Sequence, residues 1–336
     1  MTEALISTTD LSVEFLIRGG VFKSKVLKAV DGISIDIPNG SFFGVVGESG
    51  SGKTTLGRAL LNAVPIAKGG ATYDDGEVRY DLATMSPAEL KDYRKRAQLI
   101  FQDPYAALSP RMTVRDIIAE PLEVMGLTSG REETDQRVRE IAAKCRLNLE
   151  HLRRFPHAFS GGQRQRISIA RALVSKPQFI VADESVAALD VSIQADVLNL
   201  LKSIQTEMGL TFMFISHDLS VVAHTCDHVA VMYLGRIVES APTKELFDKT
   251  RHPYTKALFS AIPSLDPDAE KTGQKLSGEI PSPTQQPSGC TFHTRCPFTQ
   301  DICKKEVPVL EMSEKGHSVS CHRWKELMGS AALEKA

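Results

Sequence analysis

A glycine-rich segment near residue 50 has the residue types and the spacing of a phosphate-binding loop. It runs Gly47, Glu48, Ser49, Gly50, Ser51, Gly52, Lys53, Thr54, Thr55. Its glycines let backbone amides turn toward phosphate oxygens, Lys53 can reach the outer phosphates, and the Thr54 hydroxyl can ligate Mg²⁺. The sequence therefore predicts that this whole segment binds a nucleotide.

The segments on either side of the loop fit this prediction. Residues 42–46 are an apolar run typical of a buried strand, and residues 56–64 can continue a helix that begins at the loop. The N-terminus of such a helix adds positive potential, which favours a bound phosphate.

A pair of carboxylates supplies the acidic element that nucleotide hydrolysis needs. The apolar residues 179–182 lead directly into Asp183 and Glu184. We expect Asp183 to hold Mg²⁺, directly or through water. Because alternate strand residues point in opposite directions, Glu184 can address the water that attacks the γ-phosphate. The alternative is a solvated pair at a strand end, and the phosphate-binding loop in the same chain favours the catalytic reading.

A third segment, Ser160, Gly161, Gly162 and Gln163, precedes a run of helical periodicity. A serine and two glycines at a helix N-terminus suit phosphate binding, although taken alone they indicate only a helix cap.

The order of these motifs resembles that of the ATP-binding cassette family over residues 5–250. The motifs are the phosphate-binding loop, Gln102, Ser160 to Gln163, Asp183 and Glu184, the segment Ala188, Leu189 and Asp190, and His217. The resemblance implies a head-to-tail dimer in which ATP lies between one subunit's phosphate-binding loop and the other's Ser160 to Gln163 segment. It also implies that neither subunit completes a site alone.

The resemblance also implies roles for single residues. Gln102 is expected to touch Mg²⁺ or the attacking water and to meet a membrane subunit, and His217 to contact the γ-phosphate. Asp190 belongs to the family's D-loop and is expected to contribute to nucleotide binding. Phe15, with Phe22 as second candidate, is expected to stack on adenine, a core phenylalanine being the alternative.

The chain departs from the family's pattern at three positions. Phe159 replaces the usual Leu, Ser185 replaces a Pro that often follows the catalytic Glu, and Ala187 stands where Ser is common. None of these changes removes a phosphate-binding, metal-binding or basic group, so we expect a hydrolysis-competent site.

Periodicity predicts the elements that position these residues. Alternation over residues 11–38 indicates antiparallel strands, residues 86–154 have a helical period, and two buried strands at 178–182 and 211–215 flank a helix, which implies parallel pairing. With the resemblance, the expected fold is α/β. It is a P-loop NTPase cassette with a RecA-like core, an antiparallel β lobe and a helical subdomain at about 86–175. We expect a nucleotide-binding domain over 1–250 and a loop-rich, cysteine-containing region over 251–330.

Composition narrows the function classes. The chain has 336 residues and a formal net charge of -1, which argues against a nucleic-acid partner. No apolar stretch approaches the roughly 20 residues of a spanning helix, and the first ten residues are polar. We therefore expect a soluble protein and, from the resemblance, a peripheral one at the cytoplasmic face of the inner membrane.

Four of the six cysteines, Cys290, Cys296, Cys303 and Cys321, lie in the last fifth of the chain. In a reducing compartment, clustered thiols favour a metal over disulfides. The ligand type suits a 4Fe-4S cluster or tetrahedral zinc, and the absence of a Cys-x-x-Cys pair disfavours a common zinc ribbon. Resemblance to peptide-importer ATPases with cluster-bearing tails favours iron–sulfur, in a structural role.

Four segments resemble ATPase subunits of dipeptide and oligopeptide importers, most of all the second of their two ATPases. They are residues 191–194, 216–220, 232–236 and 252–258. This implies a partner ATPase, as a heterodimer or a homodimer, two transmembrane permease subunits and an extracytoplasmic solute-binding protein. Relatives of these importers also carry nickel chelates, glutathione, opines or oligosaccharides.

The rival hypotheses are a soluble cassette ATPase acting on ribosomes or DNA and a non-hydrolysing regulatory cassette. The single phosphate-binding loop disfavours the first, and intact Lys53, Asp183, Glu184 and His217 disfavour the second.

Overall fold

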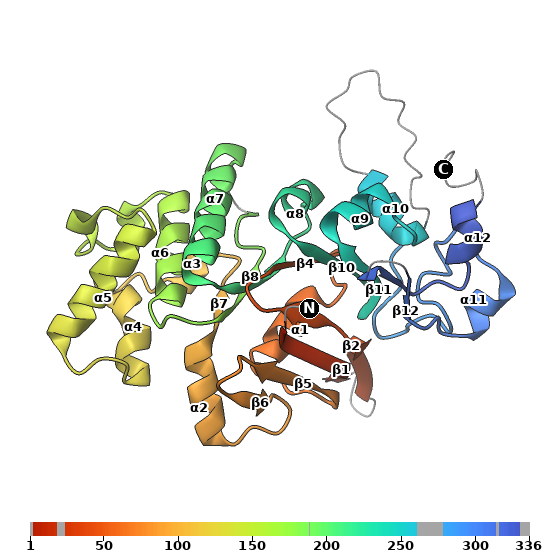
Figure 1. The fold of residues 1–336 in the computed structure, drawn as a ribbon, viewed down its shortest axis with the longest axis horizontal. Helices are drawn as coiled ribbons and strands as arrows, with labels where there is room; N and C mark the ends of the chain where they lie inside the picture. The colour runs from red at the N-terminus through yellow and green to blue at the C-terminus, as the bar shows by residue number, and fades with distance from the viewer. Residues whose placement is uncertain (1–2, 19–23, 188, 261–277, 314–315, 330–336) are drawn as a thin grey trace.

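The computed structural model describes residues 3–18, 24–187, 189–260, 278–313 and 316–329. Figure 1 shows a central sheet with helices at one end, a second sheet below it and the C-terminal region at the other end. The strands are β1 (Ala4–Arg18), β2 (Ser24–Ile33), β3 (Asp36–Pro38), β4 (Phe42–Val46), β5 (Lys68–Asp74), β6 (Arg79–Asp81), β7 (Ala97–Ile100), β8 (Phe179–Asp183), β9 (Thr211–Ile215), β10 (His228–Tyr233), β11 (Arg236–Pro242), β12 (Glu311–Met312) and β13 (Ser318–Val319).

The helices connect these strands and cover the sheets. They are α1 (Lys53–Leu60), α2 (Pro87–Arg96), α3 (Pro104–Ala107), α4 (Val114–Met125), α5 (Arg131–Lys144), η1 (Leu149–His151), η2 (Pro156–Ala158), α6 (Gly161–Leu173), α7 (Val191–Met208), α8 (Leu219–Thr225), α9 (Thr243–Asp248), α10 (Pro253–Ser260), α11 (Asp301–Lys305) and α12 (Trp324–Gly329).

The central sheet has the strand order β12-β13-β11-β10-β4-β9-β8-β7. The five strands from β10 to β7 pair in parallel, which confirms the parallel pairing that the sequence predicts. The carboxyl ends of parallel strands meet at one edge of a sheet, so the loops after β4, β8 and β9 lie together there.

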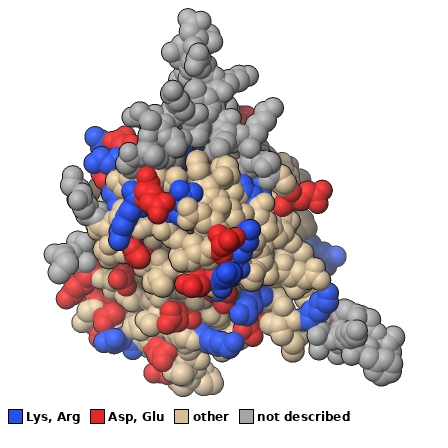
Figure 2. Space-filling view, turned by 90° about the vertical axis from the view of Figure 1, so that its right-hand side faces the viewer, with Lys and Arg blue, Asp and Glu red and all other residues tan. Residues whose placement is uncertain are grey.

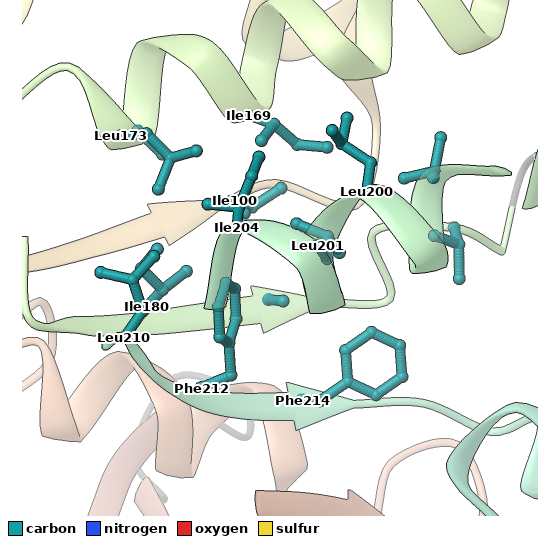
Figure 3. Close-up of a cluster of buried hydrophobic side chains, with 14 of the residues drawn as sticks. Ile100, Ile169, Leu173, Ile180, Leu200, Leu201, Ile204, Leu210, Phe212 and Phe214 are labelled. Atoms are coloured by element: carbon teal, nitrogen blue, oxygen red, sulfur yellow. The ribbon is translucent and has the colours of Figure 1, made fainter. Parts of the chain in front are cut away.

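Alternating side chains of these buried strands form two cores. Phe42 and Phe212 belong to the core under α6 and α7, whereas their neighbours Phe43 and Met213 belong to the core that contains α1 and the second sheet. Figure 3 shows the first core, where side chains of α6 and α7 meet Ile180, Phe212 and Phe214. Strands that are covered on both faces must be apolar throughout, which explains why they read as continuous apolar runs in the sequence.

The second sheet has the order β2-β1-β5-β6, with β3 also paired to β1. Its pairs are antiparallel, which confirms the β-rich lobe expected from residues 11–38.

Helices α3 to α6 form a separate group at one end of the molecule (Figure 1). The stretch 86–175, expected to be a helical subdomain, also contains β7, a strand of the central sheet. Helix α2 packs with the β lobe, because Tyr93 is fully buried in its core and donates a hydrogen bond to Leu60 O at 2.6 Å.

The C-terminal region joins the central sheet. Strand β13 pairs with β11 through Glu239 and Ser240, and β12 pairs with β13. Phe292 is buried in the same core as the strands of the cassette. The described part of this region is therefore packed against the nucleotide-binding domain as well as being loop-rich.

At the end of the molecule that holds the C-terminal region, the surface carries Lys, Arg, Asp and Glu side chains side by side (Figure 2). Among the described residues, no helix is both long enough and apolar enough to cross a membrane.

Candidate nucleotide-binding site

The loop between β4 and α1 approaches neighbouring backbone so closely that two glycines are required. Gly47 has φ 149° and Gly52 has φ 104°. A Cβ atom would lie 2.2 Å from Met232 O at Gly47 and 2.2 Å from Ala29 O at Gly52. Both the left-handed conformation and the contact exclude larger residues, which explains the glycine positions of the motif physically.

The side chain of Lys53 lies inside this loop and supplies its positive charge. Its Nζ donates hydrogen bonds to Gly47 O at 2.7 Å and to Glu48 O at 2.9 Å. Burial lowers the pKa of Lys53, while the nearby carboxylates of Glu184, Asp183 and Glu48 oppose that shift. An anion bound in the loop would add to these carboxylates in favouring the charged ammonium.

Thr54 and Asp183 meet at the predicted Mg²⁺ position. The Thr54 hydroxyl donates a hydrogen bond to Asp183 Oδ1 at 2.9 Å. Burial raises the pKa of Asp183, the Thr54 hydrogen bond lowers it, and the Glu184 charge raises it further. A hydroxyl and a carboxylate oxygen side by side are a donor set that fits Mg²⁺.

Glu184, Gln102 and His217 converge after the strands β8, β7 and β9. Gln102 Nε2 donates a hydrogen bond to Glu184 Oε2 at 2.8 Å, and His217 Nδ1 lies 3.4 Å from Glu184 Oε1. The backbone of Glu184 has φ 44°, a left-handed conformation that a residue with a Cβ seldom adopts. The structure therefore brings all three predicted catalytic residues together, with a strained backbone at the central one.

A cavity of about 420 Å³ lies over the loop and beside this cluster. It is lined by Phe15, Leu27, Lys28, Ala29, Ser49, Gly50, Gly52, Lys53, Thr54, Thr55, Gln102, Glu184, Leu234, Gly235 and Pro283. Phe15, predicted to stack on adenine, is one of the residues that line this cavity, whereas Phe22 is outside the described residues. The sequence did not predict the cavity residues from β2, the β10–β11 turn and the C-terminal region, because no nucleotide-binding motif includes them.

The Ser160 to Gln163 segment, which the family resemblance assigns to the partner's ATP, lies away from this cavity. Ser160 caps α6, accepting a hydrogen bond from Gln163 N at 3.4 Å, while its own N–H donates to Gln163 Oε1 at 3.0 Å. Neither these residues nor Gly161 and Gly162 line the cavity. Asp190 caps α7 by accepting a hydrogen bond from Ile193 N at 3.1 Å, and its neighbour Ala188 is outside the described residues.

The four C-terminal cysteines line one small, mostly apolar cavity. Burial raises the pKa of Cys290 to about 11 and that of Cys321 to about 12. In the described residues, no three Cys, His, Asp or Glu side chains are arranged closely enough to hold a metal ion. The sulfur donors thus share a cavity as expected, but they do not form a ligand set.

Two family profiles match the sequence. Residues 30–187 match the profile described as ABC transporter, and residues 238–303 match the one described as the C-terminal region of oligopeptide/dipeptide transporters.

Curated relatives match over nearly the full chain. The chain is 49% identical to a putative peptide import ATP-binding protein of Brucella ovis, over 95% of this chain and 99% of the relative. It is 48% identical to the oligopeptide transport ATP-binding protein OppF of Escherichia coli K12, over 95% and 96%. For AppF of Bacillus subtilis 168, also an oligopeptide transport ATP-binding protein, the identity is 45% over 95% and 97%.

Solved structures share the fold. A dimeric ATP-binding cassette in a post-hydrolysis state, bound to ADP and Pi, superposes with a TM-score of 0.62 at 24% identity, over 71% of this chain and 98% of that one. This likeness confirms the expected cassette fold.

Proposed function

The chain belongs to the ATP-binding cassette (ABC) transporter family, as an ATP-binding subunit of the oligopeptide and dipeptide importer type, and we propose that it hydrolyses ATP to power peptide uptake. The observation that carries this proposal is the meeting of Gln102, Glu184 and His217 beside the phosphate-binding loop.

The proposed chemistry divides among these groups. Lys53 and the loop amides bind the outer phosphates, while Thr54 and Asp183, with Gln102, would hold the Mg²⁺ that neutralises phosphate charge. Glu184 orients the attacking water and accepts its proton, since its carboxylate is anchored on two sides by Gln102 and His217. His217 is placed to contact the γ-phosphate.

Hydrolysis would require a second cassette. Ser160, Gly161, Gly162, Gln163 and Asp190 do not line this chain's own cavity. Several of them are exposed, at the N-termini of α6 and α7. We therefore propose that they serve the ATP bound by a partner ATPase subunit, as a heterodimer or a homodimer.

A groove beside Gln102 suits a membrane subunit. It lies between the β7 region and helices α4 and α6, and is lined in part by Phe101, Glu120, Val124 and Arg171. Phe101 is 41% exposed and Val124 75% exposed, and apolar side chains gathered on one exposed groove are typical of interfaces. We propose that a permease subunit docks here, placing the chain at the cytoplasmic face of the membrane with two permeases and an extracytoplasmic solute-binding protein.

The cysteine cavity is the basis of a further part of this proposal. The four thiols would hold a 4Fe-4S cluster, with zinc as the alternative, once they are deprotonated and brought together as ligands. Anaerobically purified protein is expected to be brown and to contain iron. Colourless protein that contains neither iron nor zinc would refute a metal site.

Substitution of Glu184 tests the ATPase proposal. Glu184→Gln in the assembled transporter is expected to keep ATP binding and to lower the hydrolysis rate by on the order of 10²-fold or more, because the amide cannot accept the proton of water. Glu140→Gln, an exposed change on α5, serves as the control and should hydrolyse ATP at the wild-type rate. Normal turnover by Glu184→Gln would contradict the assigned role.

A further inference from the structure

The C-terminal region contacts the phosphate-binding loop through Glu48. Arg295, which lies between Cys290 and Cys296, donates from Nη1 to Glu48 Oε2 at 2.7 Å and from Nη2 to Glu48 Oε1 at 3.1 Å. This is a bidentate ion pair, the arrangement that fixes a carboxylate most firmly. The side chain of Arg295 is only 6% exposed and that of Glu48 24%, so water screens the pair weakly.

The backbone of Glu48 is fastened as well. Its N–H donates a hydrogen bond to the Tyr254 hydroxyl at 3.0 Å, and its carbonyl accepts one from Lys53 Nζ at 2.9 Å. Tyr254 is fully buried at the start of α10. Glu48 is therefore held by the C-terminal region, by α10 and by the loop's own lysine at once.

An aromatic cluster of Tyr233, Tyr254 and Phe292 holds Arg295 in place. The rings of Tyr233 and Tyr254 have centroids 4.7 Å apart, and Phe292 lies 5.3 and 5.4 Å from them. The Arg295 guanidinium lies 5.8 Å from the Tyr233 ring, and its backbone N–H donates to Phe292 O at 3.0 Å. Because all three rings are almost completely buried, the arginine cannot follow Glu48 freely if that residue moves.

The charge of Glu48 explains why such an anchor is needed. A carboxylate in a loop that cradles phosphates would repel the nucleotide and compete for Lys53. Most of that cost disappears if an arginine neutralises the carboxylate and holds it outside the nucleotide cavity. Glu48 does not line the nucleotide cavity, which fits this arrangement.

We propose that Arg295 is a positioning residue of the nucleotide site: it neutralises Glu48 and holds the first part of the phosphate-binding loop in the conformation that accepts ATP. The inference rests on the proposed ATPase function. It assigns to the C-terminal region a direct part in nucleotide affinity within the same chain.

Nucleotide binding to the full-length chain tests the proposal, with fluorescent analogues of ATP and ADP and with Mg²⁺ present. Arg295→Met leaves Glu48 unpaired and is expected to weaken ATP binding about tenfold, and ADP binding less, since ADP carries less phosphate charge. The double variant Glu48→Gln/Arg295→Met removes the repelling charge and should bind ATP within about twofold of the wild type.

Two further variants complete the design. Lys304→Met removes a positive charge from the same region, where Lys304 pairs with the exposed Asp301 at 3.3 Å, and should leave ATP affinity unchanged. Arg295→Lys keeps the positive charge but loses the bidentate geometry, so its ATP binding is expected to be about threefold weaker than that of the wild type. This variant also tests the proposal if Arg295→Met does not fold.

Wild-type affinity in both Arg295 variants would overturn the inference. So would a double variant as weak as Arg295→Met, because the loss would then be structural and not electrostatic. A wild-type chain that binds no ATP would instead refute the proposed function itself.

Discussion

Glu184 shows how one residue combines a chemical role with a conformational cost. Its side chain was predictable, because two carboxylates after an apolar run in a chain with a phosphate-binding loop indicate Mg²⁺ and a general base. Its backbone conformation could not be predicted: φ is 44°, and the N–H of Glu184 donates a hydrogen bond to Ile215 O on the neighbouring strand, a pairing that no local pattern shows. The carboxylate itself contacts Gln102 on one side and His217 on the other.

Burial determines the protonation state of His252. It precedes α10 and accepts a hydrogen bond from Tyr254 N on Nδ1 at 3.1 Å. It is 1% exposed, and this burial lowers its pKa to about 4, although the Glu239 charge opposes the shift. The folded state thus requires the neutral ring.

Stability should therefore fall in acid. The unfolded chain takes up the His252 proton near pH 6.5, whereas the folded chain does so only near pH 4. The neutral His252 ring therefore contributes to the free energy of unfolding above pH 6.5, and this contribution is lost as the pH falls toward 4. The loss is on the order of 3 kcal/mol at most. Urea unfolding across this range is expected to show a smaller pH slope for His252→Asn, whose amide oxygen can still accept from Tyr254 N, than for the wild type. An exposed change, His224→Asn, should keep the wild-type slope, and equal slopes in all three chains would contradict the assignment.

Among the elements, α6 and α7 are packed so closely that Gly161 is replaceable but its neighbour Gly162 is not. A Cβ atom at Gly162 would lie 2.4 Å from Ile193 Cγ2, whereas at Gly161 the nearest atom, Leu189 Cδ2, would be 3.7 Å away. Ile193 is β-branched and cannot easily turn that methyl group aside. Close packing of α6 on α7 is therefore one reason for Gly162, independent of any nucleotide.

Matched substitutions separate the two glycines. Gly162→Ala is expected to lower the free energy of unfolding of the full-length chain by about 1–3 kcal/mol through overpacking. Gly161→Ala should cost little, since alanine is a better helix former than glycine and meets only ordinary contacts. Thermal or urea unfolding measures both, and equal losses would show that the contact with Ile193 is not what limits Gly162.

Element prediction succeeded where one physical cause dominated. The strands predicted at 42–46, 178–182 and 211–215 are confirmed, the second of them one residue later at 179–183, because parallel strands covered on both faces need apolar runs. Strand β7 was missed inside a helical stretch, because its four residues are too few to show a period of their own and it is set by pairing with β8.

At the scale of the whole molecule, the C-terminal region is built into the cassette. Strand β13 extends the central sheet beyond β11. Beside that pairing, the buried Glu239 accepts hydrogen bonds from His317 Nε2 at 2.7 Å and from His252 N at 3.0 Å. A buried carboxylate that loses such a partner is left uncompensated.

Truncation should therefore destabilise the nucleotide-binding domain. A chain that ends at Ser260 loses the buried Phe292 and exposes the β11 edge, so the free energy of unfolding is expected to fall by at least about 3 kcal/mol and the protein to aggregate. A chain that ends at Gly329 keeps these contacts and is the control. A Ser260 truncation as stable as that control would show that the region is an independent appendage.

The sequence by itself determined the chemistry of this protein: a phosphate-binding loop, a carboxylate pair, a glutamine and a histidine, each marked by residue types that a nucleotide requires at short, fixed spacing. It could not determine which distant segments support them. Arg295 meets Glu48 across 247 positions, Pro283 reaches the nucleotide cavity, and β13 lies on β11. Such contacts depend on how the strands are ordered in the sheet, and strand order arises from packing of the whole chain and leaves no local pattern in the sequence.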